Sequence, residues 1–317
     1  MKRRSVSADA WPALPYKEWT DTCATLHMWT QIVGKVQLEL SPWVNHSWHV
    51  TSFVSARGLT TPPIPYGDRT FQIEFDFIDH VLGIAVSDGQ TRSLPLQPQT
   101  VADFYRDLMA ALESLSIDVR IHAAPNEVEE PIPFAEDRVH GAYERDHAHL
   151  LWRAQVQSAR VFNAFRARFI GKCSPVHLFW GAPDLAVTRF SGRPAPRHPG
   201  GFPNLPDVVT VEAYSHEVSS CGFWPGNASA PDPIFYSYAY PTPEGFAESS
   251  VRPDAAFWLA DMGEFVLPYE AVRTSGDPDA TLIAFLQSTY EAAANLAQWN
   301  RAELERPAGY TPYEPAG

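Results

Sequence analysis

The chain has 317 residues, of which 45% are hydrophobic, enough to build one large or two small globular domains. Its formal net charge of -13 disfavours a nucleic-acid partner, because nucleic-acid binders need a basic surface that releases counterions from phosphates. The three cysteines lie far apart and form no Cys-x-x-Cys pair, which predicts free thiols in the cytoplasm rather than disulfides. No apolar run approaches 18 residues, and none follows the basic N-terminus, so we expect neither a membrane span nor a signal peptide.

The first half of the chain predicts a helix, a sheet and a second helix. After residues 1–10, which we expect to be disordered, a helix of roughly 19–33 should end at Gly34. Alternating apolar residues predict strands within 35–40, 49–56 and 71–86, and Asp88-Gly89 predicts a hairpin turn. Residues 101–115 read as an amphipathic helix with Thr100 as its N-cap.

The second half begins after an acidic, proline-containing segment, 122–147, which has no clear period and which we interpret as a connection. A long helix follows at about 148–169, then strands, then a closing helix within 279–299. The aromatic run 234–240 alternates as a strand, with Tyr236, Tyr238 and Tyr240 on one face.

Short similarities between the halves suggest a tandem duplication. Phe-Ile-Gly-Lys at 169–172 resembles Ile-Val-Gly-Lys at 32–35, and residues 75–89 and 212–226 have equal lengths and end in turn glycines. We therefore predict an α+β fold with two tandem related helix–antiparallel sheet–helix units, 11–121 and 148–305. The second unit would carry an insertion at 227–262, and 306–317 would form a disordered tail. Two such units would form one pseudo-symmetric body with a central cleft, a common place for ligands.

Histidines in apolar contexts are the first class of candidate site residue. His46, His49, His177 and His216 could converge as a divalent-metal site completed by Glu212, a ligand set that suits zinc or non-haem iron. His177, His216 and Glu212 are also candidates for catalytic acid or base. Strand period would place Glu212, Tyr214 and His216 on one face, with the outer Cα atoms about 13 Å apart. The alternative is that these are core histidines hydrogen-bonded to backbone.

Arginines and aromatic residues are the second class. Arg189 and Arg193 flank Phe-Ser-Gly and could clamp a carboxylate or phosphate of an anionic substrate, or could instead pair with the protein's own carboxylates. Trp180 and Tyr214 are further candidates for substrate contact, and the tyrosines of 234–240 could stack on a ligand or decorate an ordinary strand. No phosphate-binding loop, dinucleotide fingerprint or nucleophile elbow occurs.

Several longer motifs carry a resemblance. NHSWHV, GKCSPVHLFWGAPDLAVTRFSGR, EAYSHEVSSCGFWPG, GEFVLPYEAVR and FLQSTYEAAA resemble those of an uncharacterised bacterial family, domain of unknown function 5996, over about 11–305. The resemblance implies a soluble bacterial protein of this size and transfers no activity and no catalytic residue.

These observations favour an enzyme that acts on a small anionic molecule in the cleft, with a divalent metal as one candidate cofactor. The runner-up is a non-catalytic module that binds a small ligand or carbohydrate through its Trp and Tyr side chains. A third possibility is an interaction scaffold whose histidines and arginines are structural. The enzyme hypothesis requires the candidate side chains to converge in space.

Overall fold

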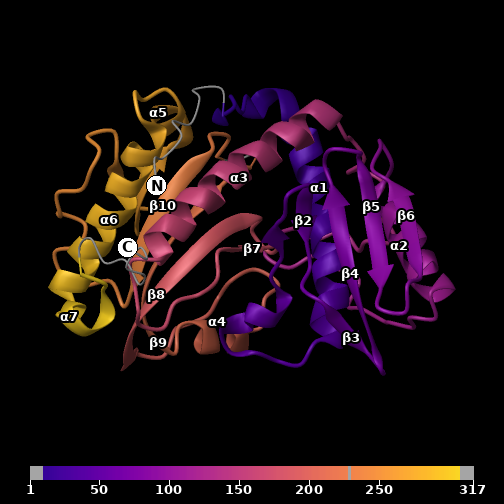
Figure 1. Ribbon diagram of the computed structural model, residues 1–317, viewed down its shortest axis with the longest axis horizontal. Helices are drawn as coiled ribbons and strands as arrows, with labels where there is room; N and C mark the ends of the chain where they lie inside the picture. The colour runs from indigo at the N-terminus through magenta and orange to yellow at the C-terminus, as the bar shows by residue number, and fades with distance from the viewer. Residues whose placement is uncertain (1–9, 228–229, 308–317) are drawn as a thin grey trace, which may run out of the picture.

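The computed structural model describes residues 10–227 and 230–307, which form an α+β fold with two antiparallel sheets (Figure 1). The helices are α1 (Tyr16–Leu40), the 3-10 helix η2 (Asn45–Val50), α2 (Val101–Ser114), α3 (Arg145–Arg166), α4 (Asp207–Ala213), α5 (Tyr269–Arg273), α6 (Pro278–Leu296) and α7 (Arg301–Leu304). The predicted disordered ends, 1–10 and 306–317, lie almost entirely outside the described residues.

The first sheet has the order β1-β2-β4-β5-β6, with β3 also pairing to β4. Its strands are β1 (Phe53–Val54), β2 (Gly58–Thr60), β3 (Ile64–Tyr66), β4 (Arg69–Asp76), β5 (Val81–Val86) and β6 (Thr91–Pro95). The predicted hairpin turn is confirmed, since β5 and β6 pair antiparallel and Gly89 has a φ of 92°.

The second sheet has the order β11-β12-β10-β9-β8-β7. Its strands are β7 (His177–Phe179), β8 (Asp184–Pro194), β9 (His216–Trp224), β10 (Ile234–Tyr240), β11 (Phe257–Leu259) and β12 (Glu264–Pro268). Strand β10, which falls in the segment interpreted as an insertion, lies between β9 and β12 in this sheet. The antiparallel α+β architecture is thus confirmed, whereas the tandem relationship of the two units stays a prediction.

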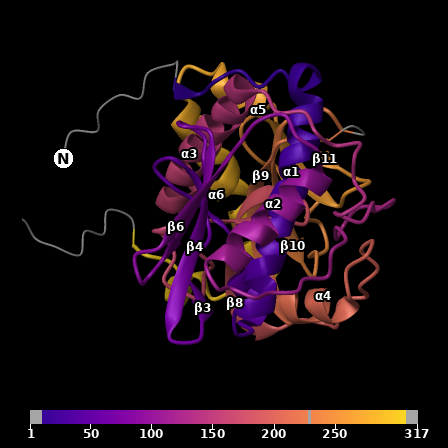
Figure 2. The same ribbon diagram turned by 90° about the vertical axis from the view of Figure 1, so that its right-hand side faces the viewer.

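Helices α1 and α2 lie side by side against one face of the first sheet (Figure 2). Phe104 of α2 stacks on Trp29 of α1 with ring centroids 4.6 Å apart, and lies 6.3 Å from Phe75 of β4. The predicted cap of α2 is confirmed, because the Thr100 hydroxyl accepts a hydrogen bond from the Asp103 amide at 3.1 Å. These contacts among α1, α2 and β4 lie in the core of the first half.

The end of α1 was predicted wrongly. The helix does not stop at Gly34 but continues to Leu40, so residues predicted as the strand 35–40 are helical. The reason is tertiary: a Cβ atom at Gly34 would lie 2.2 Å from the indole ring of Trp180, so the glycine makes room for that ring. The predicted strand over 49–56 is reduced to the two residues of β1, because η2 occupies 45–50.

The two sheets meet where β1 approaches β7. Ser52 and Leu178 form an isolated antiparallel bridge, with N···O distances of 3.0 Å and 2.7 Å. The Trp180 indole N–H donates to the Val50 carbonyl at 2.8 Å. The junction between the halves is therefore made of backbone pairing and one large buried indole.

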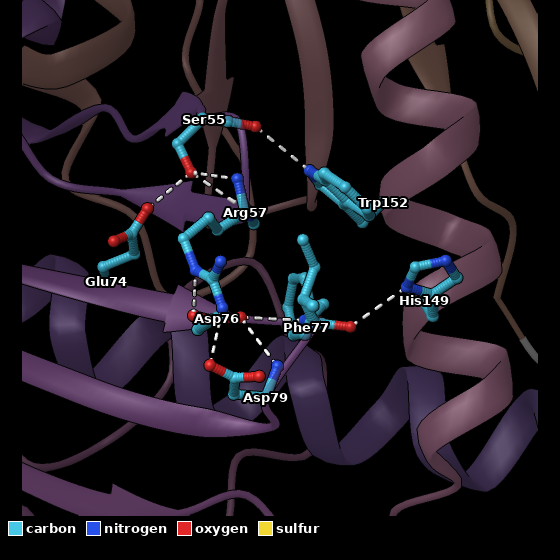
Figure 3. Close-up of polar contacts among 10 residues, drawn as sticks. Ser55, Arg57, Glu74, Asp76, Phe77, Asp79, His149 and Trp152 are labelled. Carbon is cyan, nitrogen blue, oxygen red and sulfur yellow. Dashed lines mark hydrogen bonds and ion pairs between the residues drawn. The ribbon is translucent and has the colours of Figure 1, made fainter.

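Helix α3 contacts both halves. Toward the first sheet, the Trp152 indole N–H donates to the Ser55 carbonyl at 3.1 Å, and the His149 imidazole donates to the Phe77 carbonyl at 3.0 Å (Figure 3). Toward the second sheet, α3 packs beside α6, and Phe162 lies 6.2 Å from Phe235 of β10. Helix α3 thus fixes the two sheets relative to each other.

A charged cluster joins the turn between β1 and β2 to the turn between β4 and β5 (Figure 3). Arg57 pairs with Asp76 and, at 2.6 Å, with Asp79. Asp76 also accepts two backbone hydrogen bonds, from Ile78 and Asp79, and together these contacts lower the pKa of its carboxyl against the opposing effect of burial. This guanidinium is therefore engaged in holding a turn.

The Gly34–Trp180 contact yields the first prediction. We expect Gly34→Ala to destabilise the protein by about 1–3 kcal/mol, because the ring must move away from an inserted methyl group, which outweighs the better helix propensity of alanine. Gly83→Ala is the matched control, since no atom lies within 4 Å of its Cβ position. Urea unfolding midpoints measure both; equal midpoints for the two variants would contradict this account of the extended helix.

Candidate functional site

One face of the second sheet packs on α3 and α6, and the opposite face carries a row of polar and aromatic side chains. Since side chains alternate along a strand, the pairing registers place a defined set on this opposite face. The set includes His177, Asp184, Thr188, Phe190, Ser220, Tyr236 and Tyr238. At the Phe190 end, this face meets η2 and the segment that precedes β7.

His46 and Lys172 form the central contact of this corner. The Lys172 ammonium nitrogen lies 2.6 Å from His46 Nε2, and His46 Nδ1 lies 3.0 Å from the Ala213 carbonyl oxygen. A carbonyl can only accept, so Nδ1 carries the imidazole proton and Nε2 presents its lone pair to Lys172. Burial, with Lys172 nearby, lowers the pKa of His46 and keeps the imidazole neutral. The pair therefore joins an ammonium to an available base.

Lys172 itself sits against aromatic rings. Its ammonium lies 4.8 Å from the centre of the Phe190 ring and 5.4 Å from that of Trp48. Partial desolvation by these rings lowers the pKa of the Lys172 amine, although the residue as a whole remains exposed. Lys172 was not among the site residues predicted from the sequence, because its contact with His46 joins residues 126 positions apart in the chain.

The backbone at this corner is strained. His46 and Ser47 have φ values of 61° and 57°, a left-handed conformation that costs roughly 1–2 kcal/mol per non-glycine residue. The Ser47 hydroxyl is also buried, with no hydrogen-bond partner in the described part of the chain. Strain of this kind is concentrated at functional sites, where the surrounding structure imposes it.

His216 and Glu212 approach the same corner from the second half. The rings of His46 and His216 lie 6.3 Å apart, and Glu212 accepts a hydrogen bond from the Trp43 indole. The predicted strand face holding Glu212, Tyr214 and His216 is wrong, because Glu212 lies in α4 and β9 begins only at His216. The helix nevertheless brings Glu212 toward η2.

His49 adds a second buried imidazole. Its Nδ1 accepts a hydrogen bond from the Val44 amide at 3.2 Å, so its proton resides on Nε2. That Nε2 atom is buried and has no partner in the described residues. Burial lowers the pKa of His49 against the opposing effect of Glu212, so the unpaired donor belongs to a neutral ring.

His177 is the most deeply buried of the predicted histidines, with 1% of its surface exposed. Its ring lies 4.8 Å from Phe179 and 6.3 Å from both Trp48 and Phe53, and neither ring nitrogen has a hydrogen-bond partner among the residues that the structure describes. Burial lowers its pKa to about 3. It is therefore a neutral imidazole in an aromatic pocket beside Trp48.

The structure brings His46, His49, His216 and Glu212 to one corner, with His177 on the far side of Trp48. Across residues 10–227 and 230–307, however, no three His, Cys, Asp or Glu side chains group closely enough to hold a metal ion. The metal-ligand role of His46, His49, His177 and His216 stays a prediction.

The predicted substrate-binding arginines lie elsewhere. Arg189 points to the helix-covered face, where its guanidinium carbon is 3.4 Å from the Phe165 ring centre and Nη2 donates to the Phe165 carbonyl. Arg193 pairs with Glu217 at 2.6 Å and donates to the Ala297 carbonyl. Both guanidinium groups are occupied by protein partners.

The two predicted aromatic substrate contacts are also separated. Trp180 is buried against α1, where Lys35 lies 5.5 Å from the centre of its ring. Tyr214 instead joins the tyrosines of β10, with its hydroxyl 2.9 Å from that of Tyr238. Trp180 thus belongs to the junction of the two halves and Tyr214 to the polar sheet face.

The sequence of the chain matches a known family over nearly its whole length. Residues 11–306 match the model of a family of unknown function, DUF5996, which agrees with the motifs that carried the resemblance. The chain belongs to the DUF5996 family. Comparisons of this DUF5996 chain with curated proteins and with solved structures gave no significant match. None of its described helices has both the length and the apolar character needed to cross a membrane.

The unpaired His177 ring yields the second prediction. Because its pKa falls from 6.5 to about 3 on folding, the neutral ring contributes stability that is complete above pH 6.5 and is lost as the pH falls toward 3. The loss has a limiting slope of about 1.4 kcal/mol per pH unit. His177→Phe removes the titrating group, so we expect the variant to be more stable than wild type at pH 5 and less dependent on pH.

Chemical denaturation at pH 5 and pH 8 tests this. His122→Gln, which replaces a histidine at an exposed position, serves as the control. A His177→Phe variant that retains the full acid destabilisation of wild type would show that other groups cause it.

Proposed function

We propose that this DUF5996 protein is an enzyme that acts on a small carbonyl compound, with Lys172 as the amine nucleophile and His46 as its proton acceptor. The observation that carries the proposal is the 2.6 Å contact between Lys172 Nζ and the unprotonated Nε2 of His46. A lysine becomes nucleophilic when desolvation or a neighbouring base favours its neutral form. Desolvation lowers the pKa of Lys172, and His46 Nε2 lies where it can accept the proton that the ammonium gives up.

The reaction begins with transfer of a proton from the Lys172 ammonium to His46 Nε2. The freed amine lone pair attacks the carbonyl carbon and forms a carbinolamine. The proton held by His46 then leaves with the hydroxyl group as water, which gives a protonated imine. The hydrogen bond from His46 Nδ1 to Ala213 keeps the ring oriented through both transfers.

The substrate in this proposal also carries an anionic group, in agreement with the small anionic molecule predicted from the sequence. Arg189 and Arg193 have other partners, so the one positive charge of the Lys172–His46 pair, first on the ammonium and then on the imidazolium, would supply the attraction. In a chain with a formal charge of -13, such a local positive charge selects for anions that the rest of the surface repels.

The position of the pair supports a site between the proposed units. His46 comes from the segment 11–121, whereas Lys172, Glu212 and His216 come from 148–305. A reaction that depends on side chains from both segments would occur only in the assembled fold. The pseudo-symmetric arrangement and its cleft are part of this proposal.

Reductive trapping gives the third prediction. With glyoxylate and sodium borohydride at pH 7.5, we expect Lys172 to form the reduced adduct at least ~10-fold faster than Lys17, because its lowered pKa provides more free amine. Lys17 is an exposed lysine of α1. Proteolytic digestion and mass spectrometry quantify the adduct at each position.

His46→Asn is the variant that tests the base. Asparagine tolerates the left-handed backbone of position 46 but offers no imidazole, so we expect adduct formation at Lys172 to fall toward the Lys17 rate. Equal labelling of Lys172 and Lys17 in wild type would overturn the proposal. If Lys172 is labelled selectively but equally fast in His46→Asn, His46 is not the proton acceptor.

A further inference from the structure

A second group of polar side chains lies farther along the same sheet face. The rings of Tyr236 and Tyr238 are nearly parallel, with an interplanar angle of 17° and centroids 6.1 Å apart. The Tyr214 hydroxyl lies 2.9 Å from that of Tyr238. The predicted tyrosine row of β10 is therefore not an exposed decoration: the fold covers it, and Tyr236 is only 9% exposed.

Carboxyl groups surround these tyrosines. The Tyr236 hydroxyl donates to Asp184 of β8, and burial together with the nearby Glu127 raises the pKa of Asp184 to about 7. Glu127 enters from the 122–147 segment, where its side chain lies over Gly181 and burial raises its pKa. Acidic groups from three distant parts of the chain thus approach one pair of rings.

Glu264 provides an independent observation at these rings. Val266 pairs with Tyr236 across β12 and β10, so Glu264, two residues earlier, points to the tyrosine face. Only 7% of Glu264 is exposed, yet its carboxyl has no hydrogen-bond or ion-pair partner in the described residues. Burial and the charge of Asp184 raise its pKa to about 7.

The carboxyl groups of this cluster have no basic side chain as a partner in the described residues. Within the described part of the chain, no lysine or arginine forms an ion pair with Asp184, Glu127 or Glu264. Buried carboxylates are ordinarily paired, because an isolated buried charge costs several kcal/mol. The titratable groups that face one another here are Asp184, Glu127, Glu264, Tyr214, Tyr236 and Tyr238.

We propose that this cluster binds a small organic cation, such as a primary ammonium or a guanidinium group, against the tyrosine rings and between the carboxyl groups of Asp184 and Glu264. Aromatic faces attract cations, and desolvated contacts of this kind are worth about 2 kcal/mol. The carboxylates supply charge and hydrogen-bond acceptors. The site is separate from the Lys172 pair and does not depend on the function proposed there.

Binding of a cation is linked to proton release. The cation favours ionised Asp184 and Glu264, whereas both carboxyls are partly protonated near pH 7 in its absence. The affinity is therefore expected to rise between pH 6 and pH 8. A neutral ligand of the same shape would show no such rise.

Calorimetric titration of the full chain supplies the fourth prediction. The probes are n-butylammonium, methylguanidinium and tetramethylammonium chlorides, with 1-butanol as the uncharged counterpart of the first. We expect saturable binding of at least one cation at pH 8, at least ~10-fold weaker at pH 6, and no binding of 1-butanol.

Glu264→Gln is the test variant and Glu244→Gln, at an exposed position, is the control with the same change in charge. We expect the first to weaken cation binding at least ~10-fold and the second to leave it unchanged. Thermal melts verify that both variants fold. Failure of all three cations to bind, or equal affinities for the two variants, would overturn the proposal.

Discussion

The packing of Trp180 against Gly34 is the contact on which the relation between the two halves depends. The ring occupies the volume that a Cβ atom at Gly34 would take, and its indole N–H donates to the Val50 carbonyl. Ser52, two residues after Val50, pairs with Leu178. One side chain of the second half is thereby bound to both the first helix and the last residue of η2, which fixes where η2 lies.

The Lys172 corner follows from that placement. Once η2 is held between α1 and β7, residues 46 and 47 connect its two turns through left-handed backbone, a conformation that an isolated peptide of this sequence would avoid. The hydrogen bond between His46 and the Ala213 carbonyl then orients the imidazole toward Lys172. Packing at the junction therefore maintains the strained segment, away from the Lys172–His46 contact itself.

Local signals in the sequence predicted local features well. The Thr100 cap, the Asp88-Gly89 turn and the common face of the β10 tyrosines all depend on residues near one another in the chain. Gly34 was misread because its role is set by a ring 146 residues away (180 − 34). The histidines were recognised by type, but Lys172 was not, since nothing in its neighbourhood shows that His46 will lie against it. Pairings across the two halves need tertiary structure.

The two faces of the second sheet use buried polar groups differently. On the helix-covered face, Arg189 is surrounded by aromatic rings and bonded to a helix carbonyl, so its charge stabilises a packing arrangement. On the opposite face, the ring nitrogens of the equally buried His177 have no hydrogen-bond partner within the described residues. Glu264, which is 7% exposed, has none there either. Each costs the fold stability that an apolar residue would not. Both groups lie on the face that carries Phe190, whose ring contacts Lys172, so the unpartnered polar groups and the Lys172–His46 contact share one side of the sheet.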